Sequence, residues 1–255
     1  MNNNSLRRSK SRLYSPKKIF MTEFAPFTIL FEDEFFVAIN KPSGIMVHRT
    51  GLSEDKVFVA PLLQEQLGGI KVFPTHRIDR GSSGVLVFAK SSEAAKHLGE
   101  QFMGKTIDKK YLALLRGWLD EPATIDYALT DKDSNKGPLD AITRYNPIGK
   151  SEIDAPIGLR YPTARFSLVE AMPETGRRHQ IRKHFAHIHH PIIGDVRHGD
   201  VKQNKYFRDV FNMRRMMLHA ASITFEHPEK QARLTIEASI GEDFRHGLEL
   251  ANLIM

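Results

Sequence analysis

The chain has 255 residues, of which 41% are hydrophobic and 26% are charged, and it contains no cysteine. That length is enough for one large or two modest globular domains. The lack of cysteine excludes disulfides, thiolate zinc sites and cysteine nucleophiles. No apolar run approaches the ~20 residues that cross a bilayer, and the start lacks a secretory signal. We therefore expect a cytoplasmic protein.

The formal net charge of +7 is concentrated at the N-terminus. Residues 1–20 carry six basic side chains and no acidic one, which leaves 31 basic and 30 acidic residues elsewhere. We expect residues 1–25 to form a basic, disordered tail. It either stays solvated or adds phosphate contacts to a nucleic acid, and an organellar transit peptide is a further alternative.

Residues 26–255 are expected to form a single domain in which strands predominate. Strands are predicted at 27–44 (two), 84–89, 108–118, 123–129, 141–146, 164–172, 218–227 and 232–238. Helices are predicted at 57–69, 91–104, 175–190 and 241–254, and a polar hairpin or insertion at 130–163. Long strands in succession with few helices between them indicate an α/β (α+β) fold with a long, mixed, mostly antiparallel sheet.

The helix predicted at 175–190 has two distinct faces. Ile181 and Phe185 begin an apolar stripe of helical period, and a proline follows the segment. Arg178 and Arg182 stand one turn apart, so they are expected to share another face.

The stretch HRIDRGSSG at 76–84 places a single carboxylate, Asp79, among His76, Arg77 and Arg80. One interpretation is a nearly neutral surface ion pair. The other is a carboxylate held ionised by its neighbours, which acts as a base or a nucleophile once partly desolvated. Residue physics alone favours the ion pair, because structural ion pairs also perturb acids.

Other chemistries have less support. The GSSG stretch at 81–84 does not complete the G-x-S-x-G elbow of a hydrolase, and no P-loop or dinucleotide fingerprint is present. His184 and His187 stand at i, i+3 and could face one metal ion. No acidic residue lies between Glu174 and Asp195, however, so a solvated or RNA-facing helix face is favoured over zinc.

Five blocks occur in one order along the chain: NKPSGIMVH, HRIDRGSSGVLVFAK, KKYLALLRG, TGRRHQIRKHFAHIHHPIIGD and LHA. Together they resemble the signature blocks of the RluA-type pseudouridine synthases, over about residues 27–240. The resemblance implies that a uridine base is detached at N1, turned and reattached to its ribose through C5. It also implies that no metal, nucleotide or redox cofactor takes part.

The blocks are most similar to a tRNA-specific branch of that family, which implies tRNA as the partner and uridine 65, in the stem joined to the T-loop, as the target. A uridine of large-subunit ribosomal RNA is the alternative within the family. A non-catalytic RNA-binding protein of the same fold and a metal-dependent hydrolase are the rival classes. No N-terminal S4-like domain is expected, because only about 25 residues precede the matched region.

The resemblance assigns three catalytic positions. Asp79 matches the catalytic aspartate, which attacks the ribose or base or promotes glycosidic cleavage. Tyr111 matches the active-site tyrosine, which contacts the target base and is a candidate proton acceptor. Arg182 matches the arginine that pairs with the aspartate, so we expect contact between Asp79 and Arg182.

Three further positions are expected to bind RNA. Because a base inside a stem must be flipped out, the vacated space has to be filled. Arg77 matches a position associated with that task, for which a flat guanidinium is suited. Arg80 is expected to contact a phosphate, and His76 is the third predicted RNA-binding residue. A cleft across the middle of the sheet is expected to hold the site.

Overall fold

The computed structural model describes residues 26–47, 57–130, 137–157, 161–230 and 232–253. Its strands are β1 (Thr28–Glu32), β2 (Phe36–Lys41), β3 (Phe73–Pro74), β4 (Ser83–Ala89), β5 (Asp108–Arg116), β6 (Ala123–Asp126), β7 (Ile142–Ile153), β8 (Ala164–Pro173), β9 (Leu218–Glu226) and β10 (Arg233–Glu237). Its helices are α1 (Val59–Gln66), α2 (Ser92–Gly104), α3 (Gln180–His187), α4 (Val201–Asp209) and α5 (Glu242–Leu250). The basic tail predicted at 1–25 lies outside the described residues.

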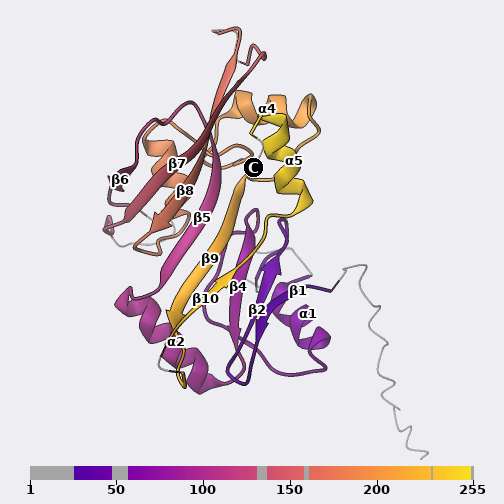
Figure 1. The fold of residues 1–255 in the computed structure, drawn as a ribbon, viewed down its shortest axis with the longest axis vertical. Helices are drawn as coiled ribbons and strands as arrows, with labels where there is room; N and C mark the ends of the chain where they lie inside the picture. The colour runs from indigo at the N-terminus through magenta and orange to yellow at the C-terminus, as the bar shows by residue number, and fades with distance from the viewer. Residues whose placement is uncertain (1–25, 48–56, 131–136, 158–160, 231, 254–255) are drawn as a thin grey trace, which may run out of the picture.

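One sheet of ten strands organises the described part of the chain, in the order β1-β2-β4-β9-β5-β8-β7-β6, with β10 paired to β9 and β3 to β4. The sheet runs the length of the molecule, with α1 and α2 towards one end and α4 and α5 towards the other (Figure 1). Every described strand pair is antiparallel except β4 and β9, which run parallel. The predicted fold class, a mixed and mostly antiparallel sheet with flanking helices, is confirmed.

Strand β4 is buried along its whole length because both faces of the sheet are covered there. Val85 and Val87 join the apolar cluster that includes Leu98 of α2, whereas Leu86 and Phe88 join the cluster around α1. Successive side chains of a strand point to opposite faces. An unbroken apolar run is therefore what a strand between two cores requires.

The parallel junction between β4 and β9 depends on Gly84, which pairs with Ala220. Gly84 has a φ of +110°, and a Cβ placed on it would lie 2.1 Å from the carbonyl oxygen of Ala220. Only glycine combines that backbone angle with so close an approach. The two strands can therefore come together directly behind the loop that carries Asp79.

Three elements differ from the sequence-based expectations. Helix α4 was not predicted, since its buried side chains are few and its residues are mostly polar. Strand β7 extends for 12 residues through the segment expected to be a hairpin or insertion, with a register shift between Pro147 and Gly149. Helix α3 begins only at Gln180, because His179 before it adopts a left-handed conformation with φ 56°. Arg178 is therefore outside the helix, and the prediction that it shares a helical face with Arg182 was wrong.

None of the described helices is long and apolar enough to cross a membrane.

Candidate active site

Asp79 lies on the loop between β3 and β4, immediately before the parallel junction. Lys41, which is fully buried, braces this loop: its Nζ donates to the carbonyl oxygens of Pro42 (2.8 Å), Ile45 (2.9 Å) and Arg80 (3.4 Å). Burial lowers the pKa of Lys41 to about 7, against the opposing charge of nearby Asp79. The Lys41 side chain thus fixes the main chain of the loop from its buried side, and the Asp79 side chain remains 21% exposed.

Arg182 joins the loop of Asp79 to α3. Its Nη1 donates to Asp79 Oδ2 at 2.8 Å, while its Nε and Nη2 donate to the two carboxylate oxygens of Asp195, each at 2.7 Å. Burial works against the charge of Arg182, but Asp195 and Asp79 outweigh it and raise its pKa. The predicted contact between Asp79 and Arg182 is present, and Arg182 proves to be shared between two carboxylates.

Asp195 is the buried anchor of this arrangement, with a side chain that is 0% exposed. Besides Arg182, its Oδ1 accepts the backbone N–H groups of Arg197 (2.9 Å) and His198 (3.0 Å). Burial opposes ionisation of Asp195, yet the hydrogen bonds and charge of Arg182 and these two N–H groups leave its pKa below the ordinary value. The fork of two bonds therefore fixes the plane of the guanidinium and leaves one N–H aimed at Asp79.

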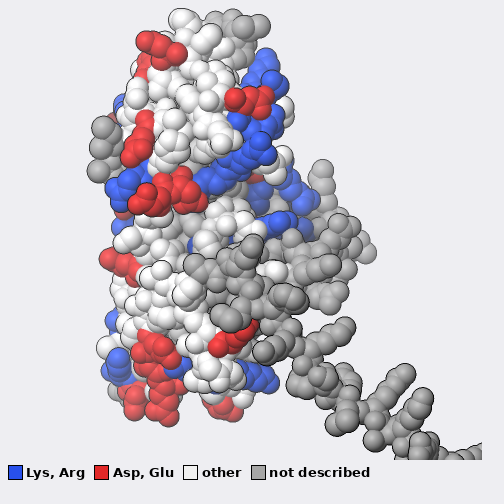
Figure 2. Space-filling model, turned by 90° about the vertical axis from the view of Figure 1, so that its right-hand side faces the viewer, with Lys and Arg blue, Asp and Glu red and all other residues white. Residues whose placement is uncertain are grey.

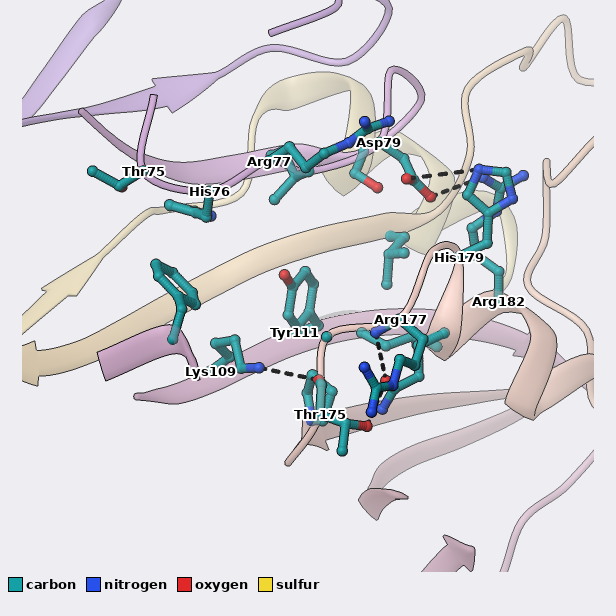
Figure 3. A pocket seen from close by; sticks show the side chains of 18 residues that line it. Thr75, His76, Arg77, Asp79, Lys109, Tyr111, Thr175, Arg177, His179 and Arg182 are labelled. Carbon is teal, nitrogen blue, oxygen red and sulfur yellow. Dashed lines mark hydrogen bonds and ion pairs between the residues drawn. The ribbon is translucent and has the colours of Figure 1, made fainter. Parts of the chain in front are cut away.

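A cavity of about 300 Å³ opens beside Asp79. Tyr111 of β5 lines it and lies between the loop of Asp79 and the loop of Thr175, with its hydroxyl directed toward the Asp79 loop (Figure 3). The pairing of β5 with β9 shifts register between Lys110 and Tyr111, where Ala221 of β9 is left as the extra residue. Burial, and secondarily the charge of Asp79, raises the pKa of Tyr111, so at neutral pH the side chain is a phenol. The structure thus brings Asp79, Tyr111 and Arg182 to one cavity.

His179 stands at the edge of the same cavity, and its unusual backbone angle places it there. Its Nε2 is 3.9 Å from Asp79 Oδ1, and its Nδ1 is 2.9 Å from His198 Nε2. Burial is the largest cause that lowers the pKa of His179 to about 4; the charges of Arg182 and His198 act in the same direction, against Asp79. His179 is therefore neutral at pH 7, whereas Arg182 supplies a full positive charge to Asp79 from α3.

The predicted RNA-binding residues take three different positions. Arg77 is exposed and lines the cavity. Arg80 is exposed, and its Nε donates to the Gly44 carbonyl at 2.9 Å, so part of its guanidinium holds the Lys41–Gly44 turn. His76 is half-buried in the cavity wall, where its Nε2 accepts the Val87 N–H at 3.0 Å. Burial, and secondarily the charge of Lys109, lowers the pKa of His76 to about 4.

Sequence reasoning missed two residues of the site: Asp195, which is buried behind Arg182, and Lys109, which lines the cavity. Asp195 stands in the quoted HHPIIGD stretch, but nothing in its local pattern indicates a partner 13 residues earlier. Lys109, two residues before Tyr111, donates from Nζ to the Thr175 carbonyl at 3.1 Å, and burial lowers its pKa to about 8 against the opposing charge of Asp108. A lysine at alternate strand spacing from the tyrosine was the available signal for this residue, since such residues share a face.

The histidines considered for zinc have other partners. His184 is buried, with its Nδ1 2.9 Å from Thr143 Oγ1 and its Nε2 3.1 Å from the Tyr127 carbonyl. His187 stacks on the Tyr127 ring with the centroids 3.6 Å apart. Among the residues the structure describes, no three His, Cys, Asp or Glu side chains are grouped as metal ligands.

Comparison with known proteins agrees with this geometry. A family model described as RNA pseudouridylate synthase matches residues 35–187, a stretch that includes Asp79, Tyr111 and Arg182. The tRNA pseudouridine synthase C of Vibrio vulnificus is 45% identical over 222 residues, which are 83% of this chain and 90% of that protein. The tRNA pseudouridine synthase C of Salmonella typhimurium is 43% identical over 230 residues, covering 86% and 88% of the two chains.

Two solved structures share the fold. Human RNA Pseudouridylate Synthase Domain Containing 1 superimposes with a TM-score of 0.66 at 23% identity, covering 84% of this chain and 83% of that one. Human RNA Pseudouridylate Synthase Domain Containing 4 superimposes with a TM-score of 0.65 at 23% identity, covering 89% and 94%. The match to the family model and the identity to the bacterial relatives confirm the predicted family and the predicted class of isomerase: the chain belongs to the RNA pseudouridylate synthase family.

Proposed function

We propose that this enzyme converts one uridine of a tRNA stem, uridine 65, to pseudouridine without a cofactor. The observation that carries the proposal is the position of Asp79, which borders a cavity of about 300 Å³ and is held there by Arg182. The relatives named tRNA pseudouridine synthase C support tRNA as the substrate class. The surface around the cavity supplies the positive charge that an RNA backbone requires.

The reaction is balanced within the nucleotide itself. The bond from ribose C1′ to N1 breaks and a bond from C1′ to C5 forms, while C5 loses a proton and N1 gains one. Asp79 serves the step that breaks the glycosidic bond, either by attack or by stabilising the separated sugar. Arg182 orients the carboxylate through a charge-assisted hydrogen bond from its Nη1 to Asp79 Oδ2.

Tyr111 contacts the target base in this proposal. As a phenol at neutral pH it can donate a hydrogen bond or lie against the base. Acting as the acceptor of the C5 proton would first require the phenolate, which burial and the charge of Asp79 both disfavour. We therefore assign Tyr111 the role of holding the base and not that of accepting the C5 proton.

Three residues bind the RNA around the flipped base. Arg77 is exposed at the cavity and fills the space that the base leaves in the stem. Arg80 contacts a phosphate with the part of its guanidinium that faces away from Gly44. His76 presents its Nδ1 side to the RNA, because its Nε2 already accepts the Val87 N–H.

The test is release of tritium from tRNA labelled at C5 of uridine, with purified protein, a chelator and no added cofactor. Release that maps to one stem uridine supports the proposal, and Asp79→Asn should abolish it while tRNA binding stays nearly unchanged. Release from ribosomal RNA but not from tRNA would overturn the substrate class. Absence of release from both RNAs would overturn the proposed activity and favour a protein that only binds RNA. An active Asp79→Asn enzyme would instead overturn the assignment of Asp79.

A further inference from the structure

Three cavities adjoin one another on the described surface. The active-site cavity shares Arg77, Asp79, His179 and Arg182 with a larger cavity of about 890 Å³, here called the arginine groove. Seven arginines line the groove: Arg77, Arg80, Arg178, Arg182, Arg197, Arg214 and Arg215. A third cavity, of about 600 Å³, lies beyond it and is here called the Tyr127 cavity.

The Tyr127 cavity is continuous with the other two. It shares Arg178, His179 and Arg197 with the arginine groove, and His179 lines all three cavities. Helix α3 forms part of its wall through Lys183 and His187. From His179 to His187 the chain advances eight residues, or about 12 Å at ~1.5 Å per helical residue. The far end of this surface is therefore only a few nucleotides away from Asp79.

The Tyr127 cavity combines an aromatic surface with positive charge. Tyr127 is 44% exposed and stacks on His187 with 3.6 Å between the ring centroids and 17° between the planes. Arg178, Lys183 and Arg197 supply three cations, and no Asp or Glu is among the described residues that line the cavity. Exposed aromatic rings interleaved with cations are the arrangement with which proteins bind nucleotides irrespective of sequence.

We propose that the Tyr127 cavity binds a second nucleotide of the substrate RNA, with its base stacked on Tyr127 and its phosphate beside Arg178 and Lys183. This inference rests on the proposed function, because continuity with the active-site cavity identifies the occupant as part of the same RNA. A stacked strand advances ~3.4 Å per nucleotide. The span of about 12 Å along α3 therefore places the bound nucleotide about three or four steps from the target uridine.

Charge distribution supports an RNA occupant over an apolar partner. Figure 2 shows the right-hand side of the view in Figure 1, where Lys and Arg side chains form a band across the upper half with Asp and Glu beside them. The positive charge of the Tyr127 cavity itself comes from Arg178, Lys183 and Arg197. Polar contacts also occur in the wall of the Tyr127 cavity: Lys183 Nζ donates to the Thr130 carbonyl at 2.8 Å, and His198 Nε2 lies 2.9 Å from His179 Nδ1. A nucleotide supplies a flat base that can stack on Tyr127 and a negative charge for the cations. An apolar peptide supplies no such charge.

The Tyr127 side chain can be removed without disturbing the backbone contacts around it. Its N–H donates to the Ala141 carbonyl at 3.1 Å, and its carbonyl accepts from His184. Tyr127→Ala keeps both of these bonds, whereas Tyr127→Phe also keeps the ring. Trp118 is a matched control, because it is a partly exposed aromatic residue that lines none of these three cavities.

The experiment pairs these variants with stem oligonucleotides that carry one abasic nucleotide at each of positions two to five on either side of the target. Tyr127→Ala is expected to raise KM about tenfold with kcat unchanged, while Tyr127→Phe and Trp118→Ala match the wild type. One abasic position should raise the wild-type KM by a similar factor and should cause no further loss in Tyr127→Ala, as expected for two partners in one contact.

Two results would overturn the inference. One is Tyr127→Ala with wild-type KM, and the other is additive losses at every abasic position. If the wild type releases no tritium, the proposed function fails, and the same oligonucleotides then report binding by fluorescence anisotropy. A position-specific, non-additive effect of Tyr127→Ala on Kd would still support the nucleotide site, and its absence would reject it.

Discussion

Replacement of Asp195 by asparagine tests whether the carboxylate of Asp79, which we propose to be catalytic, is positioned through Arg182. The amide can keep one acceptor for Arg197 and His198, but an NH₂ group then faces a guanidinium N–H that Asp195 now binds at 2.7 Å. Arg182 loses its fork and is expected to turn toward Asp79. A hydrogen bond to a charged group contributes roughly 1.5–3 kcal/mol. Each ~1.36 kcal/mol changes a rate constant tenfold, so loss of the hydrogen bond between Arg182 and Asp195 predicts a fall in kcat of roughly 10- to 150-fold.

The same change should lower stability. Removal of one partner of a buried ion pair costs roughly 3–5 kcal/mol, and the lower end applies because Arg182 keeps its bond to Asp79. For a chain of this size each kcal/mol shifts Tm by about 2–4 °C, so a fall of roughly 6–12 °C is expected. The pKa of Asp195 is lowered in the folded protein. Asp195 therefore stabilises the fold fully when the pH is above the ordinary pKa of an aspartate, and this stabilisation is lost as the pH falls through the lowered pKa.

Single-turnover tritium release, RNA binding and thermal unfolding measure these effects separately. Asp209→Asn is the matched control, since the ion pairs of Asp209 with Lys205 and Arg208 are exposed and its replacement should leave kcat, Kd and Tm unchanged. Asp195→Glu should recover part of kcat if a carboxylate at this place is what matters. A wild-type kcat in Asp195→Asn, alongside a lowered Tm, would refute the reasoning and leave Asp195 a purely structural residue.

Three further outcomes are expected. Gly84→Ala should fail to reach the native Tm, because its Cβ would meet the Ala220 backbone, whereas Gly99→Ala, with open space in α2, should be neutral or raise Tm. The free energy of unfolding should fall as the pH drops from about 6.5 toward 4. In this range the unfolded chain binds protons at His76 and His179, whose pKa in the folded state is lowered to about 4. Urea titrations should show a smaller fall for His76→Gln. Deletion of residues 1–20 should weaken tRNA binding and reduce its salt dependence; an unchanged slope of log Kd against log salt would show that the tail makes no phosphate contact.

Local pattern was sufficient for most of the strands and for the start of α2. Ser91 precedes that helix and its Oγ accepts the Ala94 N–H at 3.1 Å, the contact for which serine is favoured at a helix start. Strand β4 was predicted from an unbroken apolar run, and it is buried on both faces. These features depend on neighbours in the chain, which a sequence displays directly. Helix α4 could not be predicted from local pattern, because its mostly polar residues give no clear helical periodicity of apolar side chains.

The candidate site depended on contacts between distant residues. Asp79 and Arg182 are 103 positions apart, and their pairing was expected from resemblance, since residue physics alone favoured a surface ion pair. The fork between Arg182 and Asp195 escaped prediction because it depends on a loop whose path no periodicity describes. The left-handed angle of His179 also escaped it, because a histidine inside a helical pattern gives no sign of an interrupted backbone.

The parallel pairing of β4 with β9 also sets when the site can exist during synthesis. Ser83 Oγ lies 2.8 Å from His219 Nδ1, although 136 positions separate the two residues. Ribosomes add about 5–20 residues per second, so roughly 7–27 s pass between the synthesis of one strand and that of the other. Throughout that interval the Asp79 loop lacks the strand behind it. A nascent chain therefore gains the complete support of the Asp79 loop only after β9 has been synthesised.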